Sequence, residues 1–274
     1  MVKKVITCSD IHIRNFQRLE EYAEILTDFI KKCEEIASEY EKEEVRIVIC
    51  GDIIHNKNNI SPELISFTSN FIRQLEQIAK VIVIAGNHDL IVNNLSRKDA
   101  ISSIFETANF SNSFLLDNVL DYESGYVIDD DITWVVYSIY DNFMKPDIES
   151  ARNEAPNNKV IGLYHGMIVG SSLDNGSIID DGVDKGIFDG CDCVMCGDIH
   201  KRQVLRKNGI DIVYSGSLIQ QTFGETVTQH GFTVWDIETL TFEFVDIENE
   251  YGLYTFEIND FDDISNDKEI LKNY

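Results

Sequence analysis

The chain has 274 residues, of which 43% are hydrophobic, 26% are charged and three are proline. This composition is typical of a folded globular protein, and it excludes disordered, fibrous and disulfide-dense chains. The 23 lysines and arginines against 48 aspartates and glutamates give a net charge of −25, which argues against unaided affinity for nucleic acid.

The two ends of the chain carry different signals. The first residues lack the apolar core and cleavage site of a signal peptide, and no run of eighteen apolar residues could span a membrane, so we expect a cytoplasmic protein. At the other end, residues 236–274 hold twelve acidic and two basic residues, or −10 of the total charge of −25. We expect this part to form an acidic surface that faces away from any polyanion.

The first half of the sequence alternates between strand and helix patterns. Apolar and β-branched runs predict strands at 3–8, 45–50 and 81–85. Apolar residues at helical spacing predict a helix over 16–41, and Ser61-Pro62-Glu63 predicts the start of another helix that runs to residue 79. This alternation predicts a parallel sheet with right-handed crossovers.

The second half is richer in strands. Short apolar runs predict strands at 125–128, 133–138, 160–164, 193–196, 203–207, 210–214, 233–236 and 241–247. Asn208-Gly209, between two of these strands, is a strong hairpin signal. Together the two halves predict an α/β protein in which two sheets pack face to face, with helices on the outside.

Five of the six histidines lie just past the carboxyl end of a predicted strand, which is where ligands bind in open α/β sheets. Chance placement would scatter them over helices and surface loops. The motifs that contain them are, in chain order, Asp10-x-His12, Gly51-Asp52-x-x-His55, Gly86-Asn87-His88-Asp89, His165-Gly166 and Gly197-Asp198-x-His200.

These motifs bring several carboxylates to one edge of the sheet. Asp10, Asp52 and Asp198 would repel one another there unless cations lay between them. Imidazole, carboxylate and amide ligands together suit Mn²⁺, Fe²⁺ or Zn²⁺ better than Ca²⁺ or Mg²⁺. Seven or eight candidate ligands exceed one tetrahedral site, so the sequence predicts two metal ions. Such a pair can clamp both oxygens of an in-line phosphoryl displacement.

Each motif also has a structural interpretation. Asp10 or Asp52 alone could cap a helix, and Gly86-Asn87 could be a simple turn. His165 alone could be a core histidine, and His55 could have a structural role. Five such motifs in this order argue against a purely structural role for all of them together. His230 lies outside the pattern, and we assign it no function.

The six cysteines predict reduced, structural thiols and no disulfide framework. Cys8, Cys50 and Cys196 each end an apolar run, as residues at the end of a buried strand do. Cys191-x-Cys193-x-x-Cys196 is compatible with zinc binding, but no second cluster completes four ligands, and its alternation also fits a strand.

The five histidine motifs resemble the signature of the calcineurin-like metallophosphoesterases, whose fold is a two-sheet β-sandwich in α-β-β-α layers. Gly51-Asp52-x-x-His55 further resembles the SbcD-type exonuclease subunits of double-strand-break repair complexes, whereas protein phosphatases have Gly-Asp-x-x-Asp-Arg-Gly. The same branch is similar at Tyr214-Ser215-Gly216-Ser217-Leu218, at Phe223-Gly224-Glu225 and at His230-Gly231-Phe232.

By position, the resemblance implies two divalent metal ions, with Mn²⁺ expected and Fe²⁺, Mg²⁺ or Zn²⁺ as alternatives. One ion would be held by Asp10, His12, Asp52 and His200, and the other by Asp52, Asn87, His165 and Asp198. His88 would protonate the leaving oxygen or stabilise the phosphate, assisted by His55, and a hydroxide bound by the metals would be the nucleophile. Gly-Asp198-x-His200 departs from the Gly-His-x-His of the family, which puts the second ligand set in doubt.

The resemblance also implies a domain organisation and partners. Residues 1–250 would form the nuclease domain, and 251–274 would be an acidic extension, at the start of a truncated capping region. DNA would be the substrate and an SbcC-type ATPase subunit the partner. A homodimer could form through the apolar faces of helices near 61–79 and 97–108, although core packing explains these faces equally well.

Six basic residues lie within ten positions after a motif. They could form a basic rim on the acidic body, or be ordinary solvated loop charges: Arg14, Lys57, Arg97, Lys98, Lys201 and Arg202. So few phosphate contacts predict weak, salt-sensitive DNA binding by the chain alone.

The sequence thus predicts a two-metal phosphodiesterase that acts on DNA in repair or recombination, as an exonuclease, an endonuclease or both. The alternatives are a metallophosphoesterase for small phosphodiesters, cyclic nucleotides or phosphoproteins, and a non-catalytic scaffold on the same fold. The missing Asp-Arg-Gly disfavours phosphoprotein substrates. The intact candidate ligands argue against a scaffold.

Overall fold

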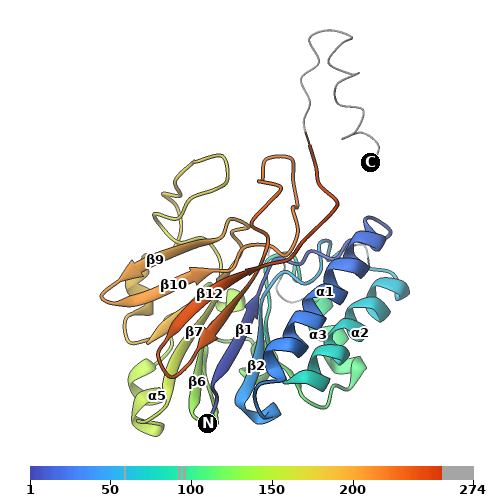
Figure 1. The fold of residues 1–274 in the computed structure, drawn as a ribbon. Helices are drawn as coiled ribbons and strands as arrows, with labels where there is room; N and C mark the ends of the chain where they lie inside the picture. The colour runs from blue at the N-terminus through green and yellow to red at the C-terminus, as the bar shows by residue number, and fades with distance from the viewer. Residues whose placement is uncertain (59, 92–93, 95–96, 255–274) are drawn as a thin grey trace, which may run out of the picture.

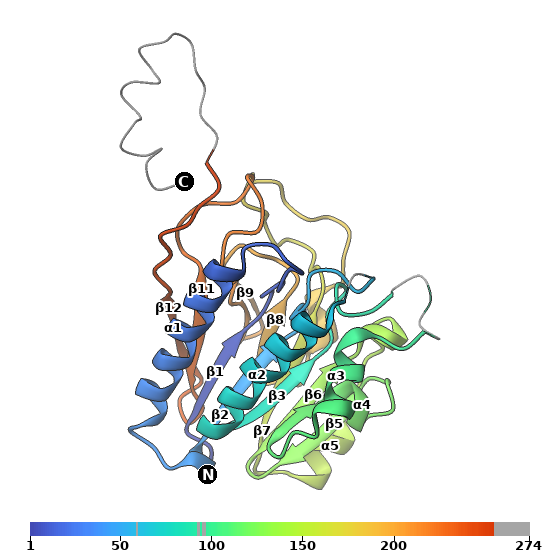
Figure 2. The same cartoon turned by 90° about the vertical axis from the view of Figure 1, so that its right-hand side faces the viewer.

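The computed structural model describes residues 1–58, 60–91, 94 and 97–254. Two six-stranded sheets pack face to face, and helices cover their outer faces (Figures 1 and 2). This confirms the predicted α/β sandwich in α-β-β-α layers. The predicted extension 251–274 lies outside the described residues from residue 255 onward.

The first sheet has the strand order β12-β11-β1-β2-β3-β4. β1 to β4 are parallel to one another, and β11 and β12 extend the sheet by antiparallel pairing. The parallel pairing places the carboxyl ends of β1, β2 and β3 at one edge. The six strands are β1 (Lys4–Cys8), β2 (Val45–Cys50), β3 (Lys80–Ile84), β4 (Ser113–Leu115), β11 (Gly231–Asp236) and β12 (Thr241–Asp246).

Three amphipathic helices cover the outer face of this sheet, where Figure 2 shows them side by side. They are α1 (Leu19–Ala37), α2 (Pro62–Ile78) and α3 (Ala100–Ala108). α2 begins as predicted, because the Ser61 hydroxyl accepts a hydrogen bond from the Leu64 N–H at 3.2 Å. The apolar faces of α2 and α3 pack in the core against β1 to β3, as the core-packing interpretation expected. A homodimer stays a prediction.

The second sheet has the strand order β5-β6-β7-β8-β10-β9. Its four central strands are parallel, and β5 and β9 are antiparallel edges. Asn208 and Gly209 form the predicted hairpin turn, with φ values of 52° and 85°. The strands are β5 (Gly125–Asp129), β6 (Ile132–Tyr137), β7 (Lys159–His165), β8 (Cys193–Gly197), β9 (Gln203–Lys207) and β10 (Ile210–Tyr214).

Shorter helical segments complete the layers. α5 (Ile148–Glu154) packs on the outer face of the second sheet through Ile148 and Ala151, and α4 (Leu116–Val119) follows β4. Three 3₁₀ helices connect other elements: η1 (Lys42–Glu44), η2 (Ile139–Asp141) and η3 (Lys185–Phe188). Among the described residues, none of the helices has the length and apolar character that a bilayer crossing requires.

The space between the sheets holds an apolar core and one buried ion-pair network. Trp134 and Trp235, both fully buried, pack in this core. Arg46 of β2 donates to Asp129 of β5 at 2.7 Å, and the Trp134 indole N–H donates to the same carboxylate at 3.1 Å. The network ties one sheet to the other near the amino end of β2.

All six cysteines are free and buried. Cys193 lies in the core between the sheets, whereas Cys196 lies in the core on the outer face of the second sheet. Because the two thiols point to opposite faces of β8, they cannot share a zinc ion. The prediction of reduced, structural cysteines is confirmed.

Candidate metal centre

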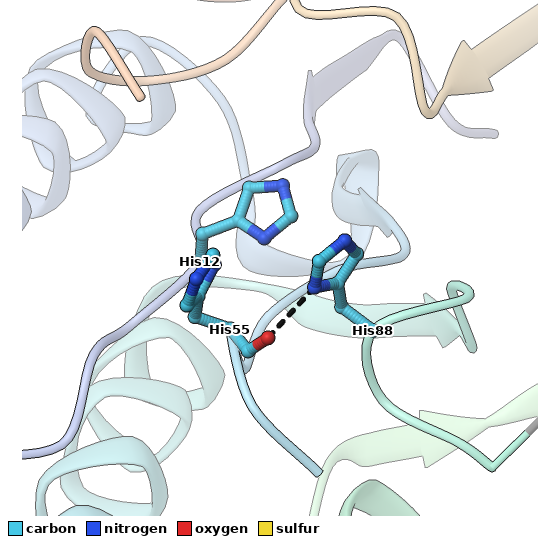
Figure 3. Close-up of side chains that lie close together, drawn as sticks. All are labelled: His12, His55 and His88. Atoms are coloured by element: carbon cyan, nitrogen blue, oxygen red, sulfur yellow. Dashed lines mark hydrogen bonds between the residues drawn. The ribbon is translucent and has the colours of Figure 1, made fainter. Parts of the chain in front are cut away.

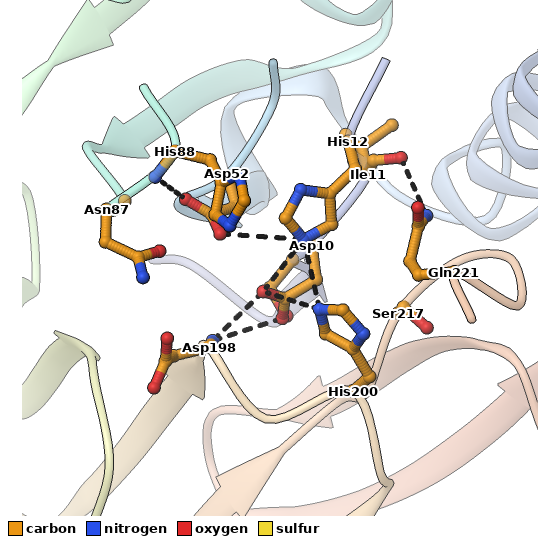
Figure 4. Close-up of polar contacts among 12 residues, drawn as sticks. Asp10, Ile11, His12, Asp52, Asn87, His88, Asp198, His200, Ser217 and Gln221 are labelled. Atoms are coloured by element: carbon orange, nitrogen blue, oxygen red, sulfur yellow. Dashed lines mark hydrogen bonds and ion pairs between the residues drawn. The ribbon is translucent and has the colours of Figure 1, made fainter. Parts of the chain in front are cut away.

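The loops that follow β1, β2, β3, β7 and β8 meet at one end of the sandwich. Their backbones are joined directly: the Asp10 N–H donates to the Gly51 carbonyl at 3.2 Å, and the Gly166 N–H donates to the Gly197 carbonyl at 3.2 Å. All nine predicted site residues come together here. Figure 4 shows seven of them, namely Asp10, His12, Asp52, Asn87, His88, Asp198 and His200.

Four of these residues have a left-handed backbone conformation, which residues other than glycine rarely adopt. The φ values are 52° at Asp10, 52° at His12, 55° at Asp52 and 92° at Asp198. Each such residue costs on the order of 1–3 kcal/mol, and such residues cluster at functional sites. Hydrogen bonds between the loops maintain the conformation, for example from the His12 N–H to the Asp52 carbonyl at 2.9 Å.

Two motif glycines allow the loops to approach one another closely. A Cβ atom on Gly86 would lie 2.2 Å from Asp52 Oδ1, and one on Gly197 would lie 2.1 Å from the Cys50 carbonyl oxygen. Any larger residue would push the neighbouring loop away. The glycines are therefore part of the centre even though they offer no ligand atom.

Asp10, His12 and His200 form the first group of candidate ligands. His12 Nε2 and His200 Nε2 are 3.0 Å apart, and they lie 4.0 and 3.9 Å from Asp10 Oδ1. The Asp10 carboxylate is held by the Ser9 hydroxyl at 2.6 Å and by the Asp198 N–H at 3.1 Å. Three donor atoms thus face one point.

The second group gathers around His165. Its Nε2 lies 3.4 Å from Asp52 Oδ1, 3.4 Å from Asn87 Oδ1 and 3.9 Å from Asp198 Oδ1. Its Nδ1 donates to the Cys50 carbonyl oxygen at 2.7 Å, which leaves Nε2 as the atom with a lone pair. Asp52 belongs to both groups, because its other oxygen, Oδ2, lies 3.5 Å from His12 Nε2.

Burial and neighbouring charges shift the protonation of these residues. Burial raises the pKa of Asp10 to about 6 and lowers the pKa of His12 well below its usual value. Burial on its own would lower the pKa of His165. The negative charge of Asp52 outweighs it and raises this pKa well above its usual value. In the same way, burial would raise the pKa of Asp52, but the charge of His165 lowers it.

The donor set fits divalent cations. Asp10 and Asp52 are two carboxylates that are 0% and 2% exposed, and a buried charge needs a compensating charge. His12 Nε2 and His200 Nε2 point at each other, although only one of them can donate a proton to the other. Three groups have all their donor atoms within 4.8 Å of one another: Asp10, His12 and His200; Asp10, Asp52 and His165; and His12, His55 and His88.

His88 and His55 lie beside this donor set (Figure 3). The His88 N–H donates to Asp52 Oδ1 at 2.7 Å, and His88 Nδ1 donates to the His55 carbonyl oxygen at 2.7 Å. The two imidazole rings stack with centroids 5.2 Å apart, and the His12 and His88 rings pack edge to face with centroids 4.6 Å apart. The hydrogen bond at Nδ1 leaves His88 Nε2 on the opposite edge of the ring, away from the His55 carbonyl oxygen.

Asp89 is a functional residue of the centre to which the sequence analysis gave no role. Its buried carboxylate accepts hydrogen bonds from the Asp52 N–H at 2.9 Å and from the Ile54 N–H at 3.0 Å. It also accepts from the Gly86 N–H at 2.9 Å, so it holds the loops after β2 and β3 together. The signal was present, since Asp89 completes Gly-Asn-His-Asp, but the partners of its carboxylate are backbone groups that the motif does not reveal.

Glu225 is the second residue of this kind. It accepts a hydrogen bond from His200 Nδ1 at 2.9 Å and lines, with His200 and Asp198, a cavity of about 320 Å³. Burial opposes the charged form of His200, but this hydrogen bond and the charge of Asp10 raise its pKa to about 9. The only sequence signal was the resemblance at Phe223-Gly224-Glu225, which suggested no role.

Five of the six basic residues near the motifs bond to neighbouring parts of the chain. Arg14 donates to the Gln221 side chain at 3.2 Å, and Arg202 pairs with Asp246 at 2.6 Å and stacks on Phe244. Lys98 pairs with Glu106. Lys57 and Lys201 stay beside the centre, where they donate to the backbone carbonyls of Asn87 and Leu173 at 2.9 and 3.4 Å. His230 bonds to Ser217 and Thr226, which are not among the nine site residues.

Comparisons with known proteins bear on this centre. A family model described as calcineurin-like phosphoesterase matches residues 3–216. Protein R555 of Acanthamoeba polyphaga mimivirus, described as uncharacterized, is 36% identical over 271 residues, which cover 94% of this chain and 19% of that protein. The chain therefore spans about a fifth of the length of this relative.

This chain matches a larger share of two other relatives. The protein named phosphoesterase 244L of Invertebrate iridescent virus 6 is 28% identical over 206 residues, 74% of this chain and 67% of that protein. The SbcD component of the nuclease SbcCD from Staphylococcus epidermidis is 26% identical over 300 aligned residues, 98% of this chain and 76% of that protein. A solved structure described as a 5'-nucleotidase from Staphylococcus aureus has a TM-score of 0.50 at 15% identity, over 98% of this chain and 58% of that chain, and shows similarity of fold alone.

Proposed function

Because the chain belongs to the calcineurin-like phosphoesterase family, we propose that it is a metal-dependent phosphodiesterase that cleaves DNA. The observation that carries this proposal is the convergence of nine side chains at the carboxyl ends of five strands, with Asp10 and Asp52 fully or almost fully buried among imidazoles. A scaffold protein would have no need for this costly burial of charge.

The two groups of donors would hold two divalent cations, for which we expect Mn²⁺. One ion would be held by Asp10, His12, Asp52 and His200, and the other by Asp52, Asn87, His165 and Asp198. When bound, such ions would activate water for attack and offset the negative charge of the phosphate. Asp198 takes the place of a histidine of the family, and its carboxylate lies on the His165 side of the centre, 3.9 Å from Nε2, as the second set requires.

His88 would transfer a proton to the leaving oxygen or bind the phosphate. Its Nδ1 is engaged by the His55 carbonyl oxygen, so only Nε2 can serve a substrate. The stacked His55 ring and the hydrogen bond from His88 Nδ1 to the His55 carbonyl oxygen fix the orientation of the imidazole, and the backbone N–H of His88 ties its loop to Asp52. His55 is therefore a positioning residue in this proposal.

DNA as the substrate is supported by the similarity to the SbcD component of the nuclease SbcCD and by the Gly51-Asp52-x-x-His55 spacing. The net charge of −25 opposes unaided binding of a polyanion. We propose that an SbcC-type ATPase subunit supplies the missing contacts and that the nuclease acts as a homodimer.

A small phosphodiester or cyclic nucleotide is the second candidate substrate, and the cavity beside His200 favours it. Its volume of about 320 Å³ suits a small molecule. Its lining includes three carboxylates, from Asp174, Asp198 and Glu225, together with the Lys201 ammonium and the His200 imidazole.

The test compares cleavage of end-labelled linear duplex and single-stranded DNA with cleavage of bis(p-nitrophenyl) phosphate, each with Mn²⁺. The wild type is compared with His88→Gln, and His230→Gln serves as the matched control because His230 is a buried histidine outside the centre. We expect Mn²⁺-dependent DNA cleavage that falls by about 10²- to 10⁴-fold in His88→Gln and persists in His230→Gln.

Other outcomes separate the candidates. Cleavage of the small diester without cleavage of either DNA, also in the presence of an SbcC-type subunit, would contradict the nuclease and favour the second candidate. If His88→Gln cleaved DNA as fast as the wild type, the role of His88 would be wrong. Loss of both activities in both variants would indicate unfolding, which circular dichroism of each variant detects.

A further inference from the structure

Glu225 lies behind His200, on the side away from the converging donor atoms. Its carboxylate Oε1 accepts a hydrogen bond from His200 Nδ1 at 2.9 Å, and the side chain is 7% exposed. From this geometry we propose that Glu225 is a positioning residue for the metal centre, which fixes the tautomer and the ring orientation of His200. This inference rests on the metal site of the proposed function.

Glu225 is itself held firmly in place. Its Oε2 accepts a hydrogen bond from the Gln221 N–H at 2.7 Å, and its Oε1 also accepts from the Thr222 hydroxyl at 3.1 Å. The backbone of the same residue is anchored, since Gln220 Nε2 donates to its carbonyl oxygen at 3.0 Å. The carboxylate therefore cannot turn away from His200 without the loss of several hydrogen bonds.

The contact decides which nitrogen of His200 is available. A carboxylate can only accept, so the proton must be on Nδ1, and Nε2 keeps its lone pair when the ring is neutral. That Nε2 lies 3.0 Å from His12 Nε2 and 3.9 Å from Asp10 Oδ1, within the first donor group. A charged acceptor behind an imidazole also strengthens its lone pair as a metal ligand.

The other two candidate imidazole ligands have no such carboxylate behind them. His165 Nδ1 donates to a neutral backbone carbonyl, that of Cys50, at 2.7 Å. His12 Nδ1 is buried and has no hydrogen-bond partner among the described residues. The effect of Glu225 should therefore fall on one of the two ions, the one held by the group of Asp10, His12 and His200.

Two variants test this role by different chemistry. Glu225→Gln keeps an oxygen that can accept from His200 Nδ1 but removes the charge, and Glu225→Ala removes both. We expect isothermal titration with Mn²⁺ to show one of two binding steps weakened by about 10-fold in Glu225→Gln and by up to about 100-fold in Glu225→Ala. The other step should stay close to that of the wild type.

A second readout follows the tautomer directly. In Zn²⁺-loaded protein with ¹⁵N-labelled histidine, the Nδ1-bound proton of His200 should give a protected signal in the wild type and in Glu225→Gln, and no protected signal in Glu225→Ala. The matched control is Glu76→Gln, because Glu76 is an equally buried carboxylate that accepts from the Ser111 and Asn112 N–H groups far from the centre. The control should leave both Mn²⁺ steps unchanged.

Two results would overturn the role of Glu225. One is an unchanged Mn²⁺ isotherm in Glu225→Ala, and the other is the same loss in Glu76→Gln. A wild type that binds no Mn²⁺ would overturn the metal centre and this inference together. A wild type that binds two ions but cleaves no DNA would contradict the proposed nuclease alone, since the titrations involve no DNA.

Discussion

At the scale of single residues, the centre depends on positions where nothing larger than a hydrogen atom fits. Gly86 is the clearest case, because its Cα faces the carboxylate and the N–H of Asp52 across the gap between two loops. Asp52 contributes one oxygen to each donor group. A displacement of this one carboxylate should therefore disturb both ions.

Gly86→Ala tests this packing. The added Cβ would lie 2.2 Å from Asp52 Oδ1 and 2.4 Å from the Asp52 nitrogen, so the loop after β2 must move. We expect titration calorimetry to show Mn²⁺ affinity reduced by at least about tenfold.

Gly209→Ala is the control for that substitution. Nothing lies within 4 Å of a Cβ at Gly209, but its φ of +85° is unfavourable for alanine. It should cost about 1 kcal/mol of stability and leave Mn²⁺ binding unchanged. Wild-type affinity in Gly86→Ala would show that the centre tolerates a wider gap than its geometry indicates.

The sequence predicted the residues of the centre better than it predicted their supports. Asp10, Asp52 and the five histidines could be found because each follows a buried strand made mostly of apolar residues. The roles of Asp89 and Glu225 could not be found, because their partners are a backbone N–H of another loop and an imidazole 25 positions away. Such pairings depend on how loops fold over one another, and no local pattern encodes that.

At the scale of elements, the buried carboxyl of Asp117 joins the two sheets next to the centre. Asp117 lies in α4, where it accepts from the Ala85 N–H after β3 at 2.7 Å and from the Ser138 hydroxyl after β6 at 2.6 Å. Burial raises the pKa of this carboxyl to about 6, above its usual value near 4.

The shift predicts a pH dependence of stability. Between about pH 4 and pH 6, the folded chain binds more protons at Asp117 than the unfolded chain does, so the contribution of this group to stability falls as the pH rises. Asp117→Asn cannot ionise, and its amide can still accept from Ala85 and donate to Ser138. Urea unfolding at pH 4, 5, 6 and 7 should therefore show a variant that gains stability relative to the wild type as the pH increases.

The outcome is read as a difference between variant and wild type, because other carboxyl groups titrate in the same range. A difference in unfolding free energy that stayed constant from pH 4 to pH 7 would contradict the raised pKa of Asp117. A variant that lost stability relative to the wild type as the pH rose would contradict the direction of the pKa shift.

The elements that escaped the sequence analysis are the short ones. β4 has three residues, α4 has four and α5 has seven, too few for a helical or alternating pattern to emerge. The longer parallel strands were all found, because a strand covered on both faces is a largely apolar run. The contacts of the basic residues could not be predicted either: Arg14 and Arg202 follow the motifs closely in sequence, but their guanidinium groups bond to neighbouring parts of the chain.

At the scale of the whole molecule, the charge distribution limits what the chain can bind alone. Two of the six expected basic residues, Lys57 and Lys201, donate to backbone carbonyls of loops at the centre. The net charge of −25 surrounds them with negative potential. Any DNA contact by the isolated chain should therefore release few counterions.

Salt titration measures the number of counterions that DNA binding releases. Fluorescence anisotropy of a labelled duplex, with Ca²⁺ in place of Mn²⁺ to suppress cleavage, should give a plot of log affinity against log salt with a slope of no more than about 2 in magnitude. Double substitution of Lys57 and Lys201 by glutamine should bring the slope close to zero. A slope of about 5 or more in the wild type would reveal a basic surface that these residues do not explain.

We expect this fold to bring two metal ions to one edge of its sandwich, with Asp52 between them. Anomalous diffraction at the manganese edge, from crystals grown with Mn²⁺, would locate these ions. Two peaks are expected, one beside Asp10, His12 and His200 and the other beside Asn87, His165 and Asp198, both in contact with Asp52. A single peak away from Asp52, or none at this edge while crystals of the same protein are well ordered, would contradict this expectation.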